Sequence, residues 1–375
     1  MRILAVSNLY PPDILGGYEI RCRRTVEWLR ARGHEVEVVT SVPLVPVAGE
    51  PGVTRGMEQA GWIARRPWRG PLDDVDAAIV NAANVRVFLE RVEATRPDVV
   101  QLWNLLGIGG AALVAAVHQL GLPWVWMLGD QVPRQLCMIE HRVIPVLSAA
   151  LTEILAEGRH VACSRGVVAE IEEGDGPKLG GRIEVLPNWV VGQRPPARGR
   201  HYAGGPLRCA FAGAVAEHKG VDVIVAAVAE LRRRGIEGVS VDVFGLPTSP
   251  REPFGIAALE AASRECVPLV TESCGYAEWF TGGVDCLTAP RDPGAVADVI
   301  AGVVAGRIQL GPIARCGADT VWRDFHIDAV LPRVEAILAE EAAAPRRREP
   351  LPAPTIHRMA LAAADLAERL LRASA

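Results

Sequence analysis

The sequence predicts an α/β protein with two domains, each built around a doubly wound sheet of parallel strands. Its 375 residues suit two domains, at about 100–200 residues per domain. Half of the residues are hydrophobic and 22% are charged, which is enough apolar surface for a sizeable core. Short apolar runs alternate with longer helical patterns along the chain, and this alternation is typical of parallel sheets with helices on both faces.

The first half of the chain supplies five expected strands. They are rich in Val, Ile and Trp and lack the strict alternation of half-exposed strands, so we expect both of their faces to be buried. The strands are Arg2–Ser7, Val36–Thr40, Asp98–Trp103, Trp124–Leu128 and Val161–Cys163. The expected helices are Tyr18–Arg32, Val75–Thr95 and Gly109–Leu120.

A second α/β series follows a loop rich in Gly, Pro and Arg at residues 191–206. Its expected strands and helices are Cys209–Ala212, Val221–Gly235, Val239–Phe244, Gly255–Arg264, Val267–Thr271 and Pro293–Ala305. We therefore predict one domain at 1–200 and a second at 201–341. Residues 342–375 are expected to form a linker and a final helix at Ile356–Leu371.

Charge and cysteine usage exclude several classes of protein. A net charge of −4 gives no global attraction to nucleic acid. No apolar run reaches the ~20 residues of a membrane span, and the N-terminus lacks the pattern of a signal peptide. The eight cysteines never form CxxC, which indicates reduced thiols in a cytoplasmic protein and no zinc site. Three arginines at 346–348 favour a solvated linker, with anionic lipid as the alternative contact.

Two motifs carry candidate chemistry. Gly16 and Gly17 open a helix after the loop that follows the first strand, and paired glycines at a helix start allow a phosphate to approach the backbone. Their alternative role is a plain strand–helix turn. Glu252 precedes a helix that contains Glu260, so the two carboxylates would lie about two turns apart along one edge. The alternative for this pair is a stabilised helix start and a solvated helix residue.

Three segments together resemble retaining glycosyltransferases of family 4, in the right order and over about residues 1–330. They are PPDILGGYEIRCRRTVEWLRARGHEVEVVT at 11–40, FAGAVAEHKGVDVIVAAVAEL at 211–231 and EPFGIAALEAASRECVPLVTESCGYAEWFTGGVDCLTAPRDP at 252–293. The resemblance implies the GT-B fold, with two Rossmann-like domains facing across a cleft and a C-terminal helix that crosses back. It also implies a nucleotide-diphosphate sugar as donor substrate, with no cofactor and no metal.

The resemblance also assigns roles to single residues. Gly16 and Gly17 would approach the donor diphosphate and the acceptor, and Lys219 would contact the diphosphate. Glu252 would lie by the transferred sugar, and Glu260 would accept hydrogen bonds from the ribose. The backbone around Phe254, Gly255 and Ile256 would start a helix aimed at the phosphates. Asp130 matches the aspartate of a His-Asp pair, so Asp130 and Glu252 are the predicted catalytic residues.

The sequence departs from the family pattern at four places. Ala214 stands where an arginine is common, Gly129 where a histidine is usual, and Glu265 where a glycine is usual. The family also carries further strand and helix units after the position of Gly245, on the order of 50 residues for two such units. We favour an omitted segment, and we expect Gly245 and Leu246 to lie farther apart than one peptide bond.

The predicted function is a metal-independent, retaining transfer of a sugar to a glycan, a lipid-linked acceptor or a small metabolite, in the cytoplasm with possible contact to the inner membrane face. Three alternatives stay open at this point. Gly107, Gly109 and Ala112 fit G-x-G-x-x-A, with Asp130 at ribose-binding distance, which would suit an NAD-dependent oxidoreductase. The departures favour a scaffold that binds a sugar nucleotide without turnover, and an epimerase could use the same scaffold.

Overall fold

The structure is a computed structural model of residues 1–375. It describes the chain except residues 65–66, 68–69, 181, 198, 200–201, 203, 214–219, 245–253, 346–348 and 375. The chain divides into two compact units. Unit 1 comprises Met1–Ala162, Val167–Val185 and Leu331–Ala375, and unit 2 comprises Cys163–Gly166 and Leu186–Val330. The C-terminal part of the chain therefore belongs to the same unit as the N-terminus.

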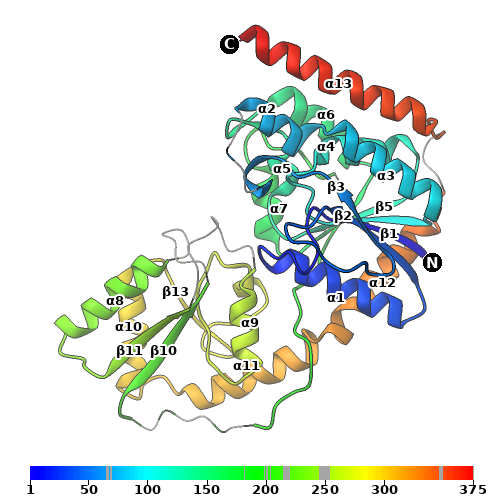
Figure 1. Cartoon of the computed structure of the whole chain (residues 1–375). Helices are drawn as coiled ribbons and strands as arrows, with labels where there is room; N and C mark the ends of the chain where they lie inside the picture. The colour runs from blue at the N-terminus through cyan, green and yellow to red at the C-terminus, as the bar shows by residue number, and fades with distance from the viewer. Residues whose placement is uncertain are drawn as a thin grey trace. The chain divides into compact units, whose positions relative to one another are not determined.

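Unit 1 is built on a seven-stranded sheet in which every pair of neighbouring strands is parallel (Figure 1). The order is β3-β2-β1-β4-β5-β8-β9. The strands are β1 (Arg2–Val6), β2 (Glu35–Ser41), β3 (Val53–Met57), β4 (Val99–Leu102), β5 (Trp124–Leu128), β8 (Arg159–Ala162) and β9 (Ile183–Val185). Every residue of β4 and β5 is buried, as expected for central strands with both faces covered.

Helices connect these strands. They are α1 (Gly17–Ala31), α2 (Pro71–Asp74), a π-helical turn at Val75–Ile79, α3 (Ala82–Thr95), α4 (Gly110–Gln119), α5 (Val132–Gln135), α6 (Pro145–Leu155) and α7 (Arg165–Glu172). Two more helices, α12 (Ile327–Ala342) and α13 (Ala353–Ser374), follow the last strand of unit 2, and most of α12 and all of α13 belong to unit 1. A 3-10 turn at Gly61–Ala64 and a short hairpin of β6 (Met138–Ile139) and β7 (Arg142–Val143) complete the set. The single helix predicted at Val75–Thr95 is wrong, because the chain leaves the helix near Val80 and Asn81 caps α3 by accepting a hydrogen bond from the Asn84 N–H at 3.1 Å.

Unit 2 contains two separate two-stranded parallel sheets, β10–β11 and β12–β13, within its described residues. The strands are β10 (Leu207–Ala212), β11 (Val239–Phe244), β12 (Leu269–Thr271) and β13 (Leu287–Ala289). The helices are α8 (Val221–Arg233), α9 (Ile256–Ala262), a 3-10 turn at Gly275–Glu278, α10 (Pro293–Val304) and α11 (Leu310–Asp324). One core joins both sheets through α8 and α10, with Ala227, Leu231 and Ile300 among its buried residues.

One face of β10–β11 is open to solvent. Arg208, Ala210 and Ala212 of β10 are exposed, and Arg208 forms an ion pair of 2.8 Å with Asp242 of β11. Parallel sheets are ordinarily covered on both faces, so this face departs from the pattern. The predicted break between Gly245 and Leu246 lies outside the described residues.

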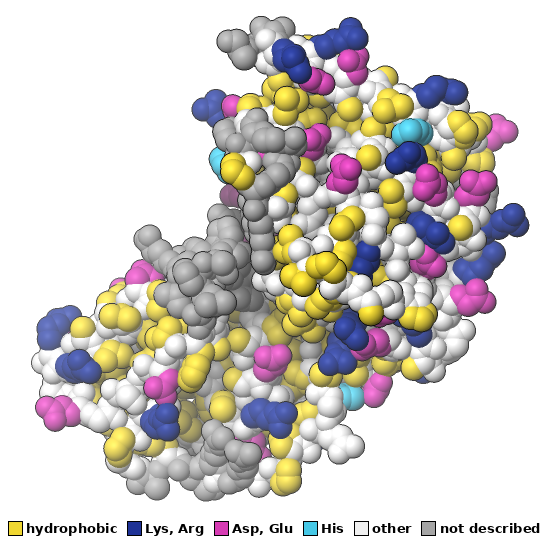
Figure 2. All heavy atoms as spheres, in the orientation of Figure 1, with side chains coloured by type: hydrophobic (Ala, Val, Ile, Leu, Met, Phe, Trp, Pro, Cys, Tyr) yellow, Lys and Arg dark blue, Asp and Glu magenta, His cyan; other side chains and the backbone are white. Residues whose placement is uncertain are grey.

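Charges of both signs are interspersed over the surface seen in Figure 2, in agreement with the small net charge. Within the described residues, no helix is both long enough and apolar enough to cross a membrane.

The residue Glu265, where the family pattern has glycine, adopts a left-handed backbone with φ of 60°. It follows α9 in a Schellman arrangement, because the Glu265 N–H donates to Ala262 O and the Cys266 N–H donates to Ala261 O, both at 3.0 Å. Glycine is preferred at this position since a Cβ destabilises the left-handed conformation by about 1–2 kcal/mol.

We predict that Glu265→Gly stabilises unit 2 by about 0.5–1 kcal/mol, because relief of the strained backbone exceeds the extra entropy of a glycine in the unfolded chain. Urea unfolding followed by circular dichroism would measure the change. Glu265→Ala is the matched control, since it removes the carboxylate and keeps the Cβ. Equal stabilisation by both substitutions would assign the effect to charge and contradict the backbone explanation.

Candidate active site

The carboxyl ends of the unit 1 strands form the edge at which the candidate site lies. The strand order reverses between β1 and β4, and open α/β sheets bind ligands outside the carboxyl ends of strands at such a point. The loops that follow these two strands are joined by hydrogen bonds. The Asn8 N–H donates to Asn104 O at 2.7 Å, and the Asn8 side-chain amide donates to Leu106 O at 2.7 Å.

The helix α1 begins at this edge with Gly16 and Gly17. The carboxylate of Glu19 accepts hydrogen bonds from the N–H groups of Gly16 (2.9 Å) and Leu15 (3.2 Å), so the Gly16 amide already has an anionic partner. Gly16 has an extended backbone with φ of −169°, and no atom lies within 4 Å of a Cβ built on it. Neither the backbone conformation nor packing within the chain therefore requires glycine at position 16. The space beside the helix start is open.

Burial affects the two acidic groups of this region. Glu19 is 2% exposed, and burial raises its pKa from the ordinary value while the N–H donors of Gly16 and Leu15 lower it. Burial is also the main cause that raises the pKa of Asp130 to about 7, with smaller contributions from the carboxylates of Glu19 and Glu170. Asp130 is therefore a carboxyl group that exchanges its proton near neutral pH.

Tyr18, the second residue of α1, reaches the end of β5. Its hydroxyl oxygen accepts hydrogen bonds from the N–H groups of Gly129 and Asp130, the latter at 3.3 Å. Asp130 Oδ1 accepts in turn from the Val132 N–H at 3.0 Å. The structure thus brings Asp130 together with the first turn of α1. Sequence reasoning missed Tyr18 and Glu19, although Gly16-x-x-Glu19 has the spacing of a capping box.

In unit 2 the predicted residues follow one another at the start of α9. Phe254 is 1% exposed and is packed in the interior, whereas Glu260 is exposed on the helix. Gly255 has φ of +91°, and a Cβ there would lie 3.1 Å from the Cys274 sulfur. Both the backbone conformation and the packing therefore require glycine at position 255. Ile256 is the first residue of α9.

Two further predicted residues, Lys219 and Glu252, lie outside the described residues, as does Ala214.

The glycines of the G-x-G-x-x-A motif pack against the chain itself. A Cβ on Gly109 would lie 2.2 Å from the Asn81 nitrogen, and one on Gly110 would lie 2.7 Å from Leu105 Cβ. A Cβ on Gly107 would lie 2.9 Å from Ile63 Cδ1. Packing within the chain therefore requires small residues at these positions, which accounts for the glycines without a bound dinucleotide.

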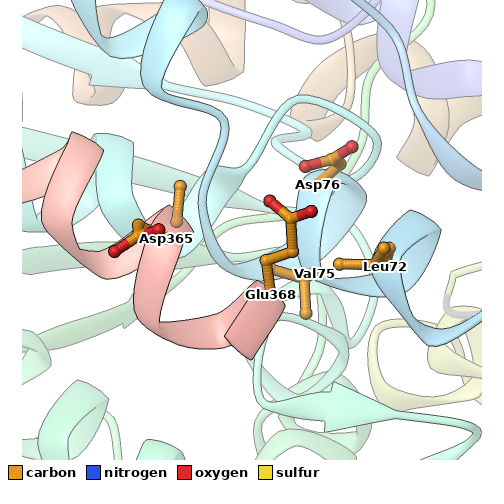
Figure 3. A pocket seen from close by; sticks show the side chains of 6 residues that line it. Leu72, Val75, Asp76, Asp365 and Glu368 are labelled. Carbon is orange, nitrogen blue, oxygen red and sulfur yellow. The ribbon is translucent and has the colours of Figure 1, made fainter. Parts of the chain in front are cut away.

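A pocket of about 350 Å³ lies elsewhere in unit 1, between the start of the π-helical turn and α13 (Figure 3). It is lined by Leu72, Val75, Asp76, Ala364, Asp365 and Glu368. Asp365 is paired with Arg369 at 2.8 Å, and Glu368 with Arg372. Among the described residues no group of three or more His, Cys, Asp or Glu could hold a metal ion. The lining contains three carboxylates and neither Lys nor Arg, so nothing in it indicates a site for a nucleotide sugar.

The first half of the chain matches a model of a known protein family. Residues 16–189 match the model of the glycosyl transferase 4-like domain. Among curated proteins, glycogen synthase from Mycobacterium tuberculosis is 25% identical over 402 residues, which covers 87% of this chain and 91% of the relative.

Solved structures show the same fold over nearly the whole chain. Sucrose-phosphate synthase from Thermosynechococcus elongatus matches with a TM-score of 0.66 and 16% identity, over 90% of this chain and 98% of that chain. HepE of Anabaena, solved with UDP and glucose, matches with a TM-score of 0.59 and 15% identity, over 91% of this chain and 100% of that chain. The GT-B fold expected from the resemblance is confirmed.

We predict that Asp130→Asn changes the pH dependence of stability. The native pKa of about 7 lies above the ordinary 3.8, so the native carboxyl keeps its proton while the unfolded one loses it. The free energy of unfolding therefore falls as pH rises from 4 to 7. Asparagine does not ionise, so the variant does not lose this stability. The free energy of unfolding of the variant minus that of wild type should therefore rise by about 2 kcal/mol between pH 4 and 7. This is less than the full pKa shift would give, because the side chain is partly exposed.

Urea unfolding at pH 4, 5.5, 7 and 8 measures the difference between the two chains. Glu93→Gln, on the exposed side of α3, is the control and should give a constant difference. A constant difference for Asp130→Asn as well would show that Asp130 ionises normally in the native state.

Proposed function

We propose that this chain is a retaining, metal-independent glycosyltransferase that uses a nucleoside-diphosphate sugar. The match of residues 16–189 to the glycosyl transferase 4-like domain and the similarity to a glycogen synthase support this proposal. The acceptor would be a glycan, a lipid-linked sugar or a small metabolite. Donor binding is supported by the solved HepE complexes with UDP and with UDP-glucose. The synthesis of polymeric glucose named for the mycobacterial relative supports a sugar acceptor.

The observation that carries this proposal is the group of residues at the carboxyl edge of unit 1. The open space at Gly16, the buried Glu19 and the partly protonated Asp130 surround the start of α1. A carboxyl group that exchanges its proton near neutral pH suits hydrogen bonding to sugar hydroxyls and transfer of a proton. Gly16 and Gly17 would admit the ligand to this edge.

Unit 2 would hold the nucleotide. We propose that Glu260, which is exposed on α9, accepts hydrogen bonds from the ribose hydroxyls. Gly255 and Ile256 would bring the start of α9 to the phosphates, and Lys219 would neutralise part of their charge. Glu252 would lie by the transferred sugar. In the retaining reaction that we propose, the acceptor would attack the sugar on the face from which the diphosphate leaves. This reaction would use no covalent cofactor.

The experiment that tests the proposal is a screen of UDP-, ADP-, GDP- and dTDP-sugars by thermal shift, followed by an assay of nucleoside-diphosphate release with and without acceptor. A donor at 100 times its Kd adds about 2.7 kcal/mol to stability. Acceptor-dependent release by the stabilising donor supports the transferase. Binding without release would support a scaffold, and rapid release without any acceptor would support an epimerase.

We predict that Glu252→Gln and Glu260→Ala impair different steps. Glu252→Gln should lower kcat and leave donor affinity nearly unchanged, because its carboxylate would act on the transferred sugar. Glu260→Ala should weaken donor binding by about 1.5–3 kcal/mol, the size of a hydrogen bond to a charged group. Steady-state kinetics with varied donor separates the two effects. Glu237→Ala, in the turn after α8, is the control, and unchanged kinetics in all three variants would refute both assignments.

A further inference from the structure

Exposed aliphatic side chains gather at the carboxyl edge of unit 1, on the loops that follow β1 and β2. They are Ile14, Leu15, Val42, Leu44 and Val45, and between 40% and 67% of each residue is exposed. We call these five residues the aliphatic patch. Figure 2 shows hydrophobic side chains gathered over the start of α1. Single exposed apolar residues are normal on a folded protein, whereas a cluster of them marks a surface that binds an apolar partner.

Hydrogen bonds join the two loops that carry the aliphatic patch. The Leu44 N–H of the second loop donates to Asp13 Oδ2 of the first loop at 2.9 Å. The Leu15 N–H donates to the carboxylate of Glu19 at 3.2 Å, which ties the end of the first loop to α1. The backbone of both loops is therefore held in place, and the patch is one continuous surface.

This patch is continuous with the candidate active site. Leu15 directly precedes Gly16, beside which the space is open. The carboxylate of Glu19 accepts from the N–H groups of both residues, so the patch and the helix start share one anchor. A ligand that enters the open space at Gly16 therefore has aliphatic side chains next to it.

The chemistry of the patch discriminates between the acceptors that the proposed function leaves open. Its side chains carry no hydrogen-bonding group, and the Asp13 carboxylate between the loops already accepts from the Leu44 N–H. The hydroxyls of a glycan would lose water on this surface without gaining partners, which is unfavourable. A hydrocarbon chain has no hydrogen bonds to lose, and each CH2 group that it buries fully raises affinity about 4-fold.

We propose that the acceptor is an amphiphile, whose polar head enters the edge at Gly16 while its hydrocarbon chain lies on the aliphatic patch. This inference rests on the proposed function, and it selects the lipid-linked class among the three acceptor classes. The patch contributes to acceptor affinity and takes no part in the chemical step, because it contacts the chain and not the reacting hydroxyl.

Binding of n-alkyl glucosides tests this inference without donor or turnover. Methyl, butyl, hexyl and octyl glucoside are titrated below the concentration at which the octyl compound forms micelles, and ligand-observed NMR measures each Kd. Affinity should rise about 2-fold for each added CH2, half of the full effect in logarithmic terms, because the patch covers one side of the chain. The octyl compound should therefore bind about 16-fold more tightly than the butyl compound. Equal affinities of these two compounds, or no binding of either, would overturn the inference.

Substitutions within the patch locate the chain-binding surface. The double variant Leu44→Ser, Val45→Ser removes aliphatic area and should reduce the octyl-to-butyl affinity ratio to about 4-fold or less. Val146→Ser is the matched control, because Val146 of α6 is 72% exposed and lies outside the patch, and it should leave the ratio within 1.5-fold of the native value. The melting temperature of each variant confirms that it folds. An unchanged ratio in the double variant would overturn the assignment to the patch.

Cosedimentation with phosphatidylcholine vesicles tests a bilayer as the occupant of the patch. The double variant should sediment with vesicles to the same extent as the native chain. Loss of vesicle binding together with an unchanged octyl-to-butyl ratio would assign the patch to a bilayer surface and overturn the acceptor assignment.

Transfer assays separate this inference from the proposed function. With the donor found by the thermal-shift screen, the KM for alkyl glucosides should fall with chain length in the native enzyme and change little in the double variant. Transfer whose KM does not depend on chain length would overturn the inference and leave the function standing. Absence of transfer to any acceptor, with the affinity ratio intact, would instead overturn the proposed function, while the chain-binding surface would remain.

Discussion

The parallel pairing of the seven strands in unit 1 is the constraint on which the site depends. Parallel strands require a crossover after each strand, so all their carboxyl ends and the loops that follow them meet at one edge. Asn8 after β1 and Asn104 after β4 are joined at that edge, and Asp130 follows β5. Residues as far as 98 positions apart in sequence thereby become neighbours, and α1 adds Tyr18 and Glu19 to the same place.

Burial at this edge raises the pKa of two carboxyl groups, those of Asp130 and Glu19. Asp130 would be a fully ionised carboxylate in water, yet protein atoms displace its solvent and raise its pKa to about 7. Glu19 is tied to the helix start by two N–H donors, which fixes the position of the next turn. The Tyr18 ring then takes the space at Gly129. The arrangement of these residues follows from the contact between α1 and the end of β5.

Much of this architecture could be predicted from the sequence, because buried parallel strands are short and strongly apolar. The strand Trp124–Leu128 was predicted with its observed bounds. Weaker patterns were missed, including β3 at Val53–Met57, which contains Arg55 and Gly56. The contact between Tyr18 and Gly129 could not be predicted, because a pair separated by 111 positions in sequence leaves no local pattern. At Glu265, by contrast, the sequence did carry a signal. The family pattern has glycine at this position, and the backbone there is left-handed, the conformation that favours glycine.

The central claim is that this chain moves a sugar from a nucleoside diphosphate to an acceptor. The most direct measurement supplies a donor with a uniformly ¹³C-labelled sugar and follows the label by mass spectrometry together with the anomeric signal by NMR. The account predicts that the intact labelled sugar appears in the acceptor product with the anomeric configuration that it had in the donor. Label recovered only as free sugar or as unchanged donor would contradict transfer, and an inverted anomeric signal would contradict retention.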